Sequence, residues 1–191
     1  MKRAALLLLF AMNAGAVELH LQFAALERML AEQVFTQEGR RYVRGTKESK
    51  CNFAYLEKPQ VRGDGGRLRM KARFSGRSAL NFAGQCVGLG DAFDVVILAL
   101  PVYKNGAIGL QEVKVTSEGK NGYYIRRVCS AMEASLARDF RYGLEREAQL
   151  LLENPSMQPN YRREVRRFNV GDIRVTNDAL VMQVDFELTV K

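Results

Sequence analysis

The stretch RLRMKARF, residues 67–74, alternates strictly between basic and apolar side chains. Successive side chains of a β-strand point to opposite faces of its sheet, so this pattern predicts a strand with one buried face and one cationic face. The four residues before it, GDGG at 63–66, are a strong turn signal, and the apolar positions of residues 51–61 lie on the other side of that turn. We therefore expect an antiparallel sheet with one face turned toward a core.

Further strand signals lie on the C-terminal side of this stretch. Residues 93–102 are almost continuously apolar, and a strand with alternating valines follows the turn at 104–106. Near the C-terminus, apolar residues alternate with polar ones over residues 180–190, after a turn at Asn177-Asp178. At roughly 3.3 Å per residue this strand would be about 35 Å long. The polar segment 37–50 and the Gly-rich segment 84–90 are expected to be loops.

Two segments have helical periodicity. Residues 122–153 place apolar side chains three to four positions apart, which predicts one helix of about 30 residues, roughly 45 Å long, ending at Asn154-Pro155. Residues 23–35 predict a short amphipathic helix. The expected fold class is α+β: a long, strongly curved antiparallel sheet wrapped around one long helix, with a short N-terminal amphipathic helix.

The N-terminus has the three zones of a secretory signal peptide. Lys2 and Arg3 precede an apolar run, and small residues end at Ala16. The run is shorter than the roughly 20 residues of a membrane-spanning helix. We expect a signal peptide at 1–16, cleaved after Ala16, and a single domain at 17–191 located in the periplasm.

The chain is basic, with 29 Lys+Arg, 21 Asp+Glu and a net charge of +8. Loss of the two cations of the signal segment leaves +6, which still favours anionic partners, and a lipid surface suits an exported protein better than nucleic acid does. No aromatic residue alternates with the basic ones, as base stacking would need, so no nucleic acid is expected. The candidate contact with an anionic membrane is the cationic strand face, formed by Arg67, Arg69, Lys71 and Arg73.

Three cysteines are present, and an oxidising compartment would permit a disulfide. We predict a bridge between Cys51 and Cys86, with Cys86–Cys129 as the alternative. Cys129 lies in the helical pattern and is interpreted as a buried free thiol.

The sequence gives little support for catalysis. His20 is the single histidine and lies beside the predicted cleavage site, where a general base would be poorly held. Paired histidines and CxxC motifs are missing, so no metal or other cofactor is expected. The protein is predicted not to be an enzyme.

Residues 98–115, LALPVYKNGAIGLQEVKV, resemble the central signature of the YceB-like bacterial envelope proteins: an apolar strand, a proline, a turn with glycine, and a strand ending in alternating valines. The order of elements is similar over nearly the whole mature chain. This resemblance implies a fold akin to the tubular lipid-binding (TULIP) superfamily, whose members hold acyl chains between sheet and helix. Such proteins often carry a lipid-anchored cysteine at the cleavage site, where this chain has Ala16-Val17.

The expected function is that of a periplasmic binding protein for lipid or another apolar ligand, without catalysis. The alternative is an envelope interaction or assembly module whose groove is filled by side chains. The apolar groove is expected to be formed by Phe74, Phe93, Val95, Ile97, Ile125, Met132, Leu136, Phe140, Met182, Val184 and Phe186.

Overall fold

The computed structural model describes residues 16–154 and 162–191. The predicted signal peptide therefore lies, apart from Ala16, outside the described residues. No helix within the described ranges is long and apolar enough to cross a membrane.

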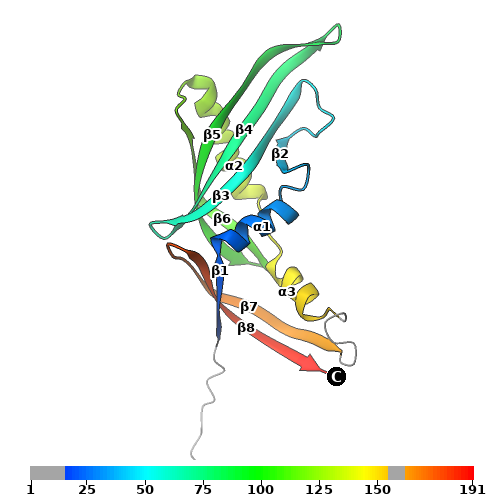
Figure 1. Ribbon diagram of the computed structural model, residues 1–191, viewed down its shortest axis with the longest axis vertical. Helices are drawn as coiled ribbons and strands as arrows, with labels where there is room; N and C mark the ends of the chain where they lie inside the picture. Colours follow the sequence, from blue (N-terminus) through cyan, green and yellow to red (C-terminus); the bar gives the residue numbers. More distant parts are fainter. Residues whose placement is uncertain (1–15, 155–161) are drawn as a thin grey trace, which may run out of the picture.

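Most of the described chain forms two antiparallel sheets (Figure 1). Neighbouring strands are antiparallel throughout both of them. The larger sheet contains β2 (Arg40–Arg44), β3 (Asn52–Asp64), β4 (Arg67–Phe82), β5 (Gln85–Lys104) and β6 (Ala107–Glu118), in that order. The smaller sheet contains β1 (Val17–Gln22), β8 (Ala179–Val190) and β7 (Arg163–Val175), with β8 in the middle.

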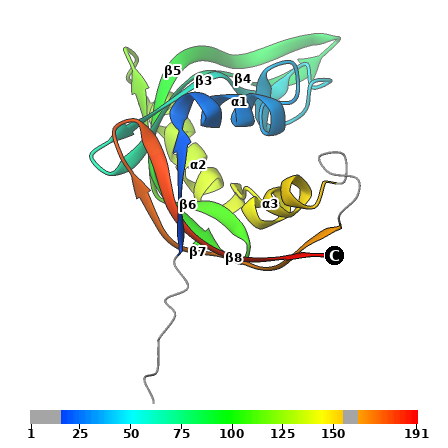
Figure 2. The same cartoon turned by 60° about the horizontal axis from the view of Figure 1, so that its bottom comes forward.

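Three helices lie on the inner side of these sheets: α1 (Phe23–Gln33), α2 (Tyr123–Asp139) and α3 (Leu144–Leu152). Figure 2 shows the sheets curving around them. Helix α1 packs against β3, α2 against β6 and α3 against β7. Two carboxylates hold α1 against β3 and α2 against β6. Glu27 accepts a hydrogen bond from the backbone N–H of Val61 at 2.6 Å, and Glu133 accepts one from the backbone N–H of Val115 at 2.8 Å.

The alternating stretch at 67–74 is a strand, as predicted. Within β4, Ala72 and Phe74 are buried, whereas Arg73 between them is exposed. Phe74 lies opposite Phe93 of β5, and the centres of the two rings are 4.9 Å apart. This pair belongs to the core between the larger sheet and α2.

The prediction of one long helix is wrong. Helix α2 ends at Asp139 and α3 begins at Leu144, and between them Tyr142 pairs with Ile108 of β6. The N–H of Ile108 donates to the Tyr142 carbonyl at 2.8 Å, and the reverse bond is 2.9 Å long. The strand edge thus supplies backbone partners that an α-helix would otherwise provide, and Gly143 beside it is a poor helix former.

The prediction of one sheet wrapped around that helix is also wrong. Strand β8 pairs on one side with β7 and on the other with β1, from Val17 opposite Val184 to Gln22 opposite Ala179. Both hydrogen-bonding edges of β8 are therefore occupied along these registers, and the C-terminal hairpin forms the centre of a separate sheet. Sequence reasoning missed β1 because these six residues follow the predicted cleavage site directly.

Two segments expected to be loops contain strand. Residues 40–44 form β2 at the edge of the larger sheet, and residues 85–90 form the first part of β5. In that part Gly88 faces β4 so closely that a Cβ atom would lie 2.5 Å from the Cα of Ala79. The glycine is therefore needed for close strand approach rather than for a loose connection.

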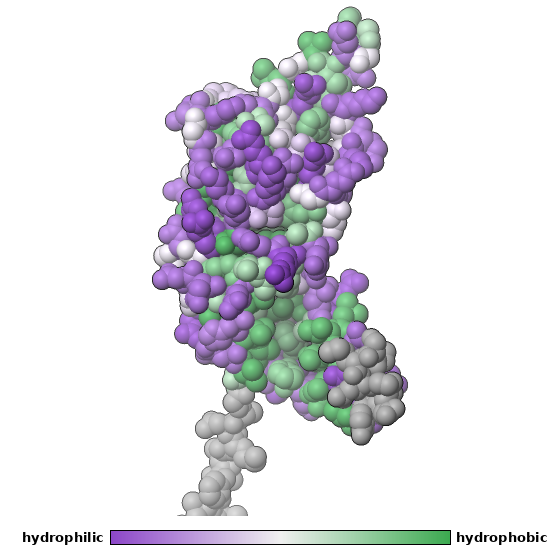
Figure 3. Space-filling model, in the orientation of Figure 1, coloured by the Kyte–Doolittle hydropathy of each residue, from purple (hydrophilic) through white to green (hydrophobic). Residues whose placement is uncertain are grey.

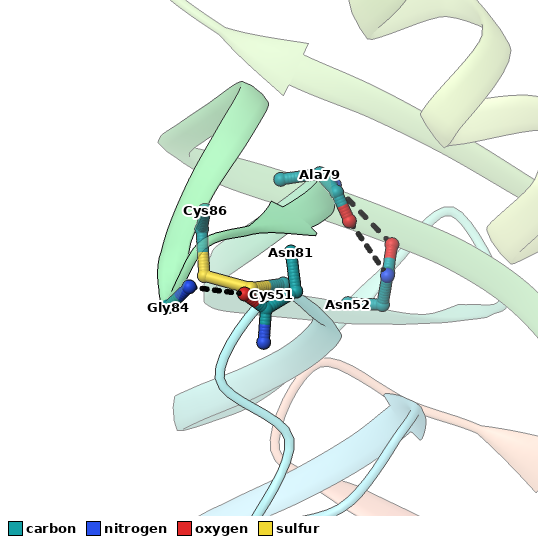
Figure 4. Close-up of a disulfide and its surroundings, with 6 residues drawn as sticks. All are labelled: Cys51, Asn52, Ala79, Asn81, Gly84 and Cys86. Carbon is teal, nitrogen blue, oxygen red and sulfur yellow. Dashed lines mark hydrogen bonds between the residues drawn. A yellow bond between two sulfur atoms is a disulfide. The ribbon is translucent and has the colours of Figure 1, made fainter.

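The predicted Cys51–Cys86 disulfide is confirmed, with the two Cα atoms 5.3 Å apart, and Cys129 is free and buried. The bridge ties the residue before β3 to the β4–β5 hairpin (Figure 4). Beside it, the Asn52 side chain donates to the Ala79 carbonyl at 2.8 Å and accepts the Ala79 N–H at 3.2 Å. The far part of this hairpin is thus attached to the body of the sheet.

Replacing both bridged cysteines, as Cys51→Ser/Cys86→Ser, should lower the free energy of unfolding by about 3–4 kcal/mol, because the bridge closes a loop of 35 residues in the unfolded chain. Urea unfolding measures the change. Under denaturing, non-reducing conditions the wild-type protein should show one free thiol, that of Cys129. Three free thiols would contradict the pairing.

Candidate ligand-binding groove

An apolar cavity of about 100 Å³ lies where the two sheets and the helices meet. Helix α1, the α2–α3 junction and strands of both sheets all contribute to its wall. On the face shown in Figure 3, apolar residues gather in the lower part, where the surface is hollowed. The lining residues are Leu21, Leu26, Met29, Leu30, Val61, Leu68, Met70, Ile97, Ala99, Ile108, Leu110, Leu136, Phe140, Tyr142, Leu144, Leu180 and Met182.

The break between α2 and α3 determines one side of this cavity. In an uninterrupted helix Phe140 and Leu144 would share one face, whereas Tyr142, about 200° further round the axis, would point to the opposite side. Because the chain is extended and bonded to β6 at Tyr142, all three of these residues line the same cavity. The backbone pairing with Ile108 is therefore part of how the site is built.

Two further cavities continue the first one along α2. A cavity of about 170 Å³ shares Leu30, Met70, Leu136 and Phe140 with it, and a cavity of about 390 Å³ shares Val43 and Ser135 with the second. We call these three adjoining spaces the groove, with an inner, a middle and an outer cavity. The groove runs between α2 and the inner face of the larger sheet.

The outer cavity differs from the inner one in charge. Arg44, Arg77 and Arg138 line it, together with the apolar Phe74 and Met132. Arg138 pairs with Asp139 at 2.7 Å, and this pairing lowers the pKa of the Asp139 carboxyl. Arg44 and Arg77 are exposed and form no ion pair with any residue that the structure describes. The groove thus passes from a cationic end to an apolar end.

The Tyr142 hydroxyl is an exception in the apolar end. It is buried and has no hydrogen-bond partner among the described residues. Burial raises the pKa of Tyr142, as does the Glu147 carboxylate, whereas the nearby Gln33 side chain, which does not reach hydrogen-bond geometry with the hydroxyl, lowers it. The hydroxyl therefore stays protonated at neutral pH and is an unused donor in the wall of the inner cavity.

The predicted groove residues are distributed over the groove walls, the two cores and the surface. Ile97, Leu136, Phe140 and Met182 line the inner cavity, and Phe74 and Met132 line the outer one. Phe93, Val95 and Ile125 are buried in the core of the larger sheet, and Val184 is buried in the core beside the smaller sheet. Phe186 is 39% exposed. The structure thus brings six of the eleven predicted residues to the groove walls.

Sequence reasoning missed the contribution of α1, and from the smaller sheet it included Met182 but neither Leu21 nor Leu180. Leu26, Met29 and Leu30 of α1 line the inner cavity. Their helical spacing was visible in residues 23–35, but nothing in that pattern shows what the apolar side of the helix faces. Leu21 and Leu180 come from β1 and β8, so their place depends on the pairing of those strands.

The predicted cationic strand face exists on β4, but its charges are largely matched by carboxylates. Arg69 lies 3.5 Å and Lys71 2.5 Å from Glu118, and Arg73 lies 3.1 Å from Asp94. Arg67 pairs with Glu112. These exposed pairs add little stability, but they reduce the net positive charge that the face offers to an anionic surface.

The described residues include no buried charged or polar residue and no group of three His, Cys, Asp or Glu side chains that would hold a metal ion. The inner cavity offers van der Waals contact and one hydroxyl, not a pair of acid and base. Searches against protein-family models, curated proteins and solved structures found no match to this chain. The resemblance to the YceB-like proteins stays a prediction.

Tyr142→Phe should leave the free energy of unfolding of the ligand-free protein unchanged or raise it by up to about 1 kcal/mol, because it removes a buried hydroxyl without a partner. Urea unfolding of the ligand-free protein tests this. A clear loss of stability would instead mean that the hydroxyl is hydrogen-bonded within the protein.

Proposed function

We propose that the protein binds a lipid or another elongated apolar molecule in the groove and does not act on it chemically. The observation that carries this proposal is the inner cavity, whose wall consists of aliphatic and aromatic residues from both sheets and all three helices. Space enclosed by such side chains forfeits dispersion contacts that an apolar ligand would restore.

The energetics favour an acyl chain or a similar group. Each buried CH₂ contributes about 0.8 kcal/mol, so a chain can bind usefully without a specific polar contact. The three cavities together exceed the roughly 300 Å³ at which ligand pockets begin. Met29, Met70 and Met182 have flexible side chains that adapt to chains of different shape.

The charges suggest the direction in which such a ligand lies. An anionic headgroup would be placed at the outer cavity, where Arg44 and Arg77 have no carboxylate partner among the described residues. Its apolar tail would then extend past Leu136 into the inner cavity. Arginine suits this role because its planar guanidinium binds carboxylate or phosphate oxygens in pairs.

The proposed location is the periplasm. Two features support it: the signal-like segment at residues 1–16 and the Cys51–Cys86 disulfide, because such bridges persist in oxidising compartments and are rare in reducing ones.

Leu136→Trp is the variant that tests the groove, because Leu136 forms part of the wall of both the inner and the middle cavity. The larger side chain should obstruct the passage between them and weaken the binding of radiolabelled palmitate at least tenfold. The matched control is Ala137→Trp, the next residue of α2, which is exposed and lines none of the three cavities.

Circular dichroism and thermal unfolding establish that both variants are folded. Equal palmitate affinity in the wild-type protein and a folded Leu136→Trp variant would contradict the placement of the site. Native mass spectrometry of the protein purified from the periplasm tests the function itself. A ligand-free mass, with no uptake of added lipid, would favour the alternative of an assembly module with a filled groove.

A further inference from the structure

The far end of the β4–β5 hairpin exposes an unusual amount of apolar surface. Leu80 and Phe82 of β4 are 78% and 75% exposed, and Val87 and Leu89 of β5 are 62% and 66% exposed. In Figure 1 this end projects beyond the other strands of the sheet, at the top of the molecule. We call these four side chains the apolar tip.

The apolar tip lies on one face of the hairpin. Leu80 is directly opposite Val87, and Leu89 is opposite Ser78, which lies two residues from Leu80. Residues directly opposite each other in an antiparallel pair point to the same side, and so do residues two apart along a strand. The same alternation leads back along β4 to the buried Phe74. The apolar tip therefore continues the inner face of the sheet beyond the part that is covered.

This exposed face is held in place. Cys86 lies opposite Asn81, on the other side of the hairpin, and its disulfide to Cys51 attaches the projecting end to the start of β3 (Figure 4). At the turn itself, Ala83 and Gly84 have φ values of 48° and 83°, as a tight two-residue hairpin turn requires, and the Asn81 side chain accepts the Gly84 N–H at 3.1 Å. The apolar tip is thus presented by a braced element.

The projecting end itself carries no acidic residue, and two cations lie close to it. Residues 78–90 contain no Asp or Glu. Arg77 precedes the tip, and Lys50 is held beside it because its neighbour Cys51 is bridged to Cys86. Neither cation forms an ion pair with a residue in the described part of the chain. By the same alternation, Arg77 and the bridged Cys86 lie on the face opposite the four apolar side chains, so the projecting end presents an apolar face with unmatched cations behind it; this combination is complementary to an anionic lipid surface.

We propose that the apolar tip inserts into the boundary between headgroups and acyl chains of an anionic bilayer, while Arg77 and Lys50 contact lipid phosphates. A second copy of the chain fits less well as the occupant. In a symmetric pair of copies, Arg77 and Lys50 of each chain would lie beside the same contact and repel their counterparts. A bilayer needs no complementary shape and accepts a small apolar element.

This contact surface differs from the ion-paired cationic face of β4 considered above. It adjoins the groove, because Arg77 and Ser78 line the outer cavity and lie just before Leu80 on β4. Insertion of the tip would therefore bring the cationic end of the groove to the membrane surface. The inference does not depend on a groove ligand, and membrane binding can be measured without one.

Sedimentation with phosphatidylglycerol-containing vesicles tests the proposal. The wild-type protein should bind these vesicles, more weakly at high salt, and Leu80→Ser/Phe82→Ser should reduce the bound fraction at equal lipid at least tenfold. The control is Leu150→Ser/Leu151→Ser, which removes two leucines of α3 that are 59% and 68% exposed. This control should bind like the wild-type protein. Equal loss in both double variants, or no loss in the tip variant, would overturn the proposal.

A second measurement locates the contact directly. The sequence has no tryptophan, so Phe82→Trp introduces a single reporter at the tip and Leu150→Trp introduces one on α3. With vesicles, the emission of Phe82→Trp should shift to the blue and be quenched by brominated acyl chains, whereas that of Leu150→Trp should not. An unquenched Phe82→Trp signal in protein that sediments with vesicles would also overturn the proposal.

Palmitate binding separates this inference from the proposed function. The Leu80→Ser/Phe82→Ser variant should keep wild-type palmitate affinity, since neither residue lines the groove. If the wild-type protein binds vesicles through the tip but takes up no palmitate, the proposed function fails and the membrane contact stands.

Discussion

Strands β4 and β5 pair without interruption from Leu68 opposite Ala99 to Phe82 opposite Gln85. This ladder is the constraint on which the other parts depend, because a shift by one residue would exchange the two faces of every residue in it. In the observed register Phe74 meets Phe93 inside the molecule, while Arg73 meets Asp94 outside. The same register places the four exposed side chains of the hairpin end on the inner side. The core, the ion-paired exterior and the projecting tip thus all depend on the register of this one strand pair.

The local features could be predicted from the sequence, and the architecture could not. Alternation at residues 67–74 and 180–190 identified β4 and β8, and cysteine chemistry led to the correct disulfide. The prediction of a single long helix is wrong for a physical reason. The apolar stripe of residues 122–153 continues through the break, whereas the break itself results from backbone hydrogen bonds between Tyr142 and Ile108, which side-chain spacing does not encode. The second sheet was missed in a similar way, because β1 is recognisable only through its pairing with β8.

The same difference between local patterns and tertiary contacts applies to the residues of the groove. Leu136 and Met182 were predicted because they belong to long regular elements whose inward side is visible in the pattern. Tyr142 lies at the irregular junction and Leu21 on the short first strand, so their positions follow from tertiary contacts alone. At Gly88 a local pattern was itself misinterpreted. A glycine-rich segment was taken for a loop, although the small residue there allows β5 to approach Ala79 closely.

The pairing of β1 with β8 joins the two ends of the described chain, and this has a consequence for the order in which the molecule assembles. In the larger sheet every strand pairs with its neighbour in sequence, so that sheet can grow by successive hairpins as the chain lengthens. Strand β1 precedes all the other strands that the structure describes, yet its partner β8 follows them all. Closing so long a loop is slow and has to wait until β8 is available. The smaller sheet contributes Leu21, Leu180 and Met182 to the inner cavity, so the wall of the cavity is incomplete until β1 and β8 have paired.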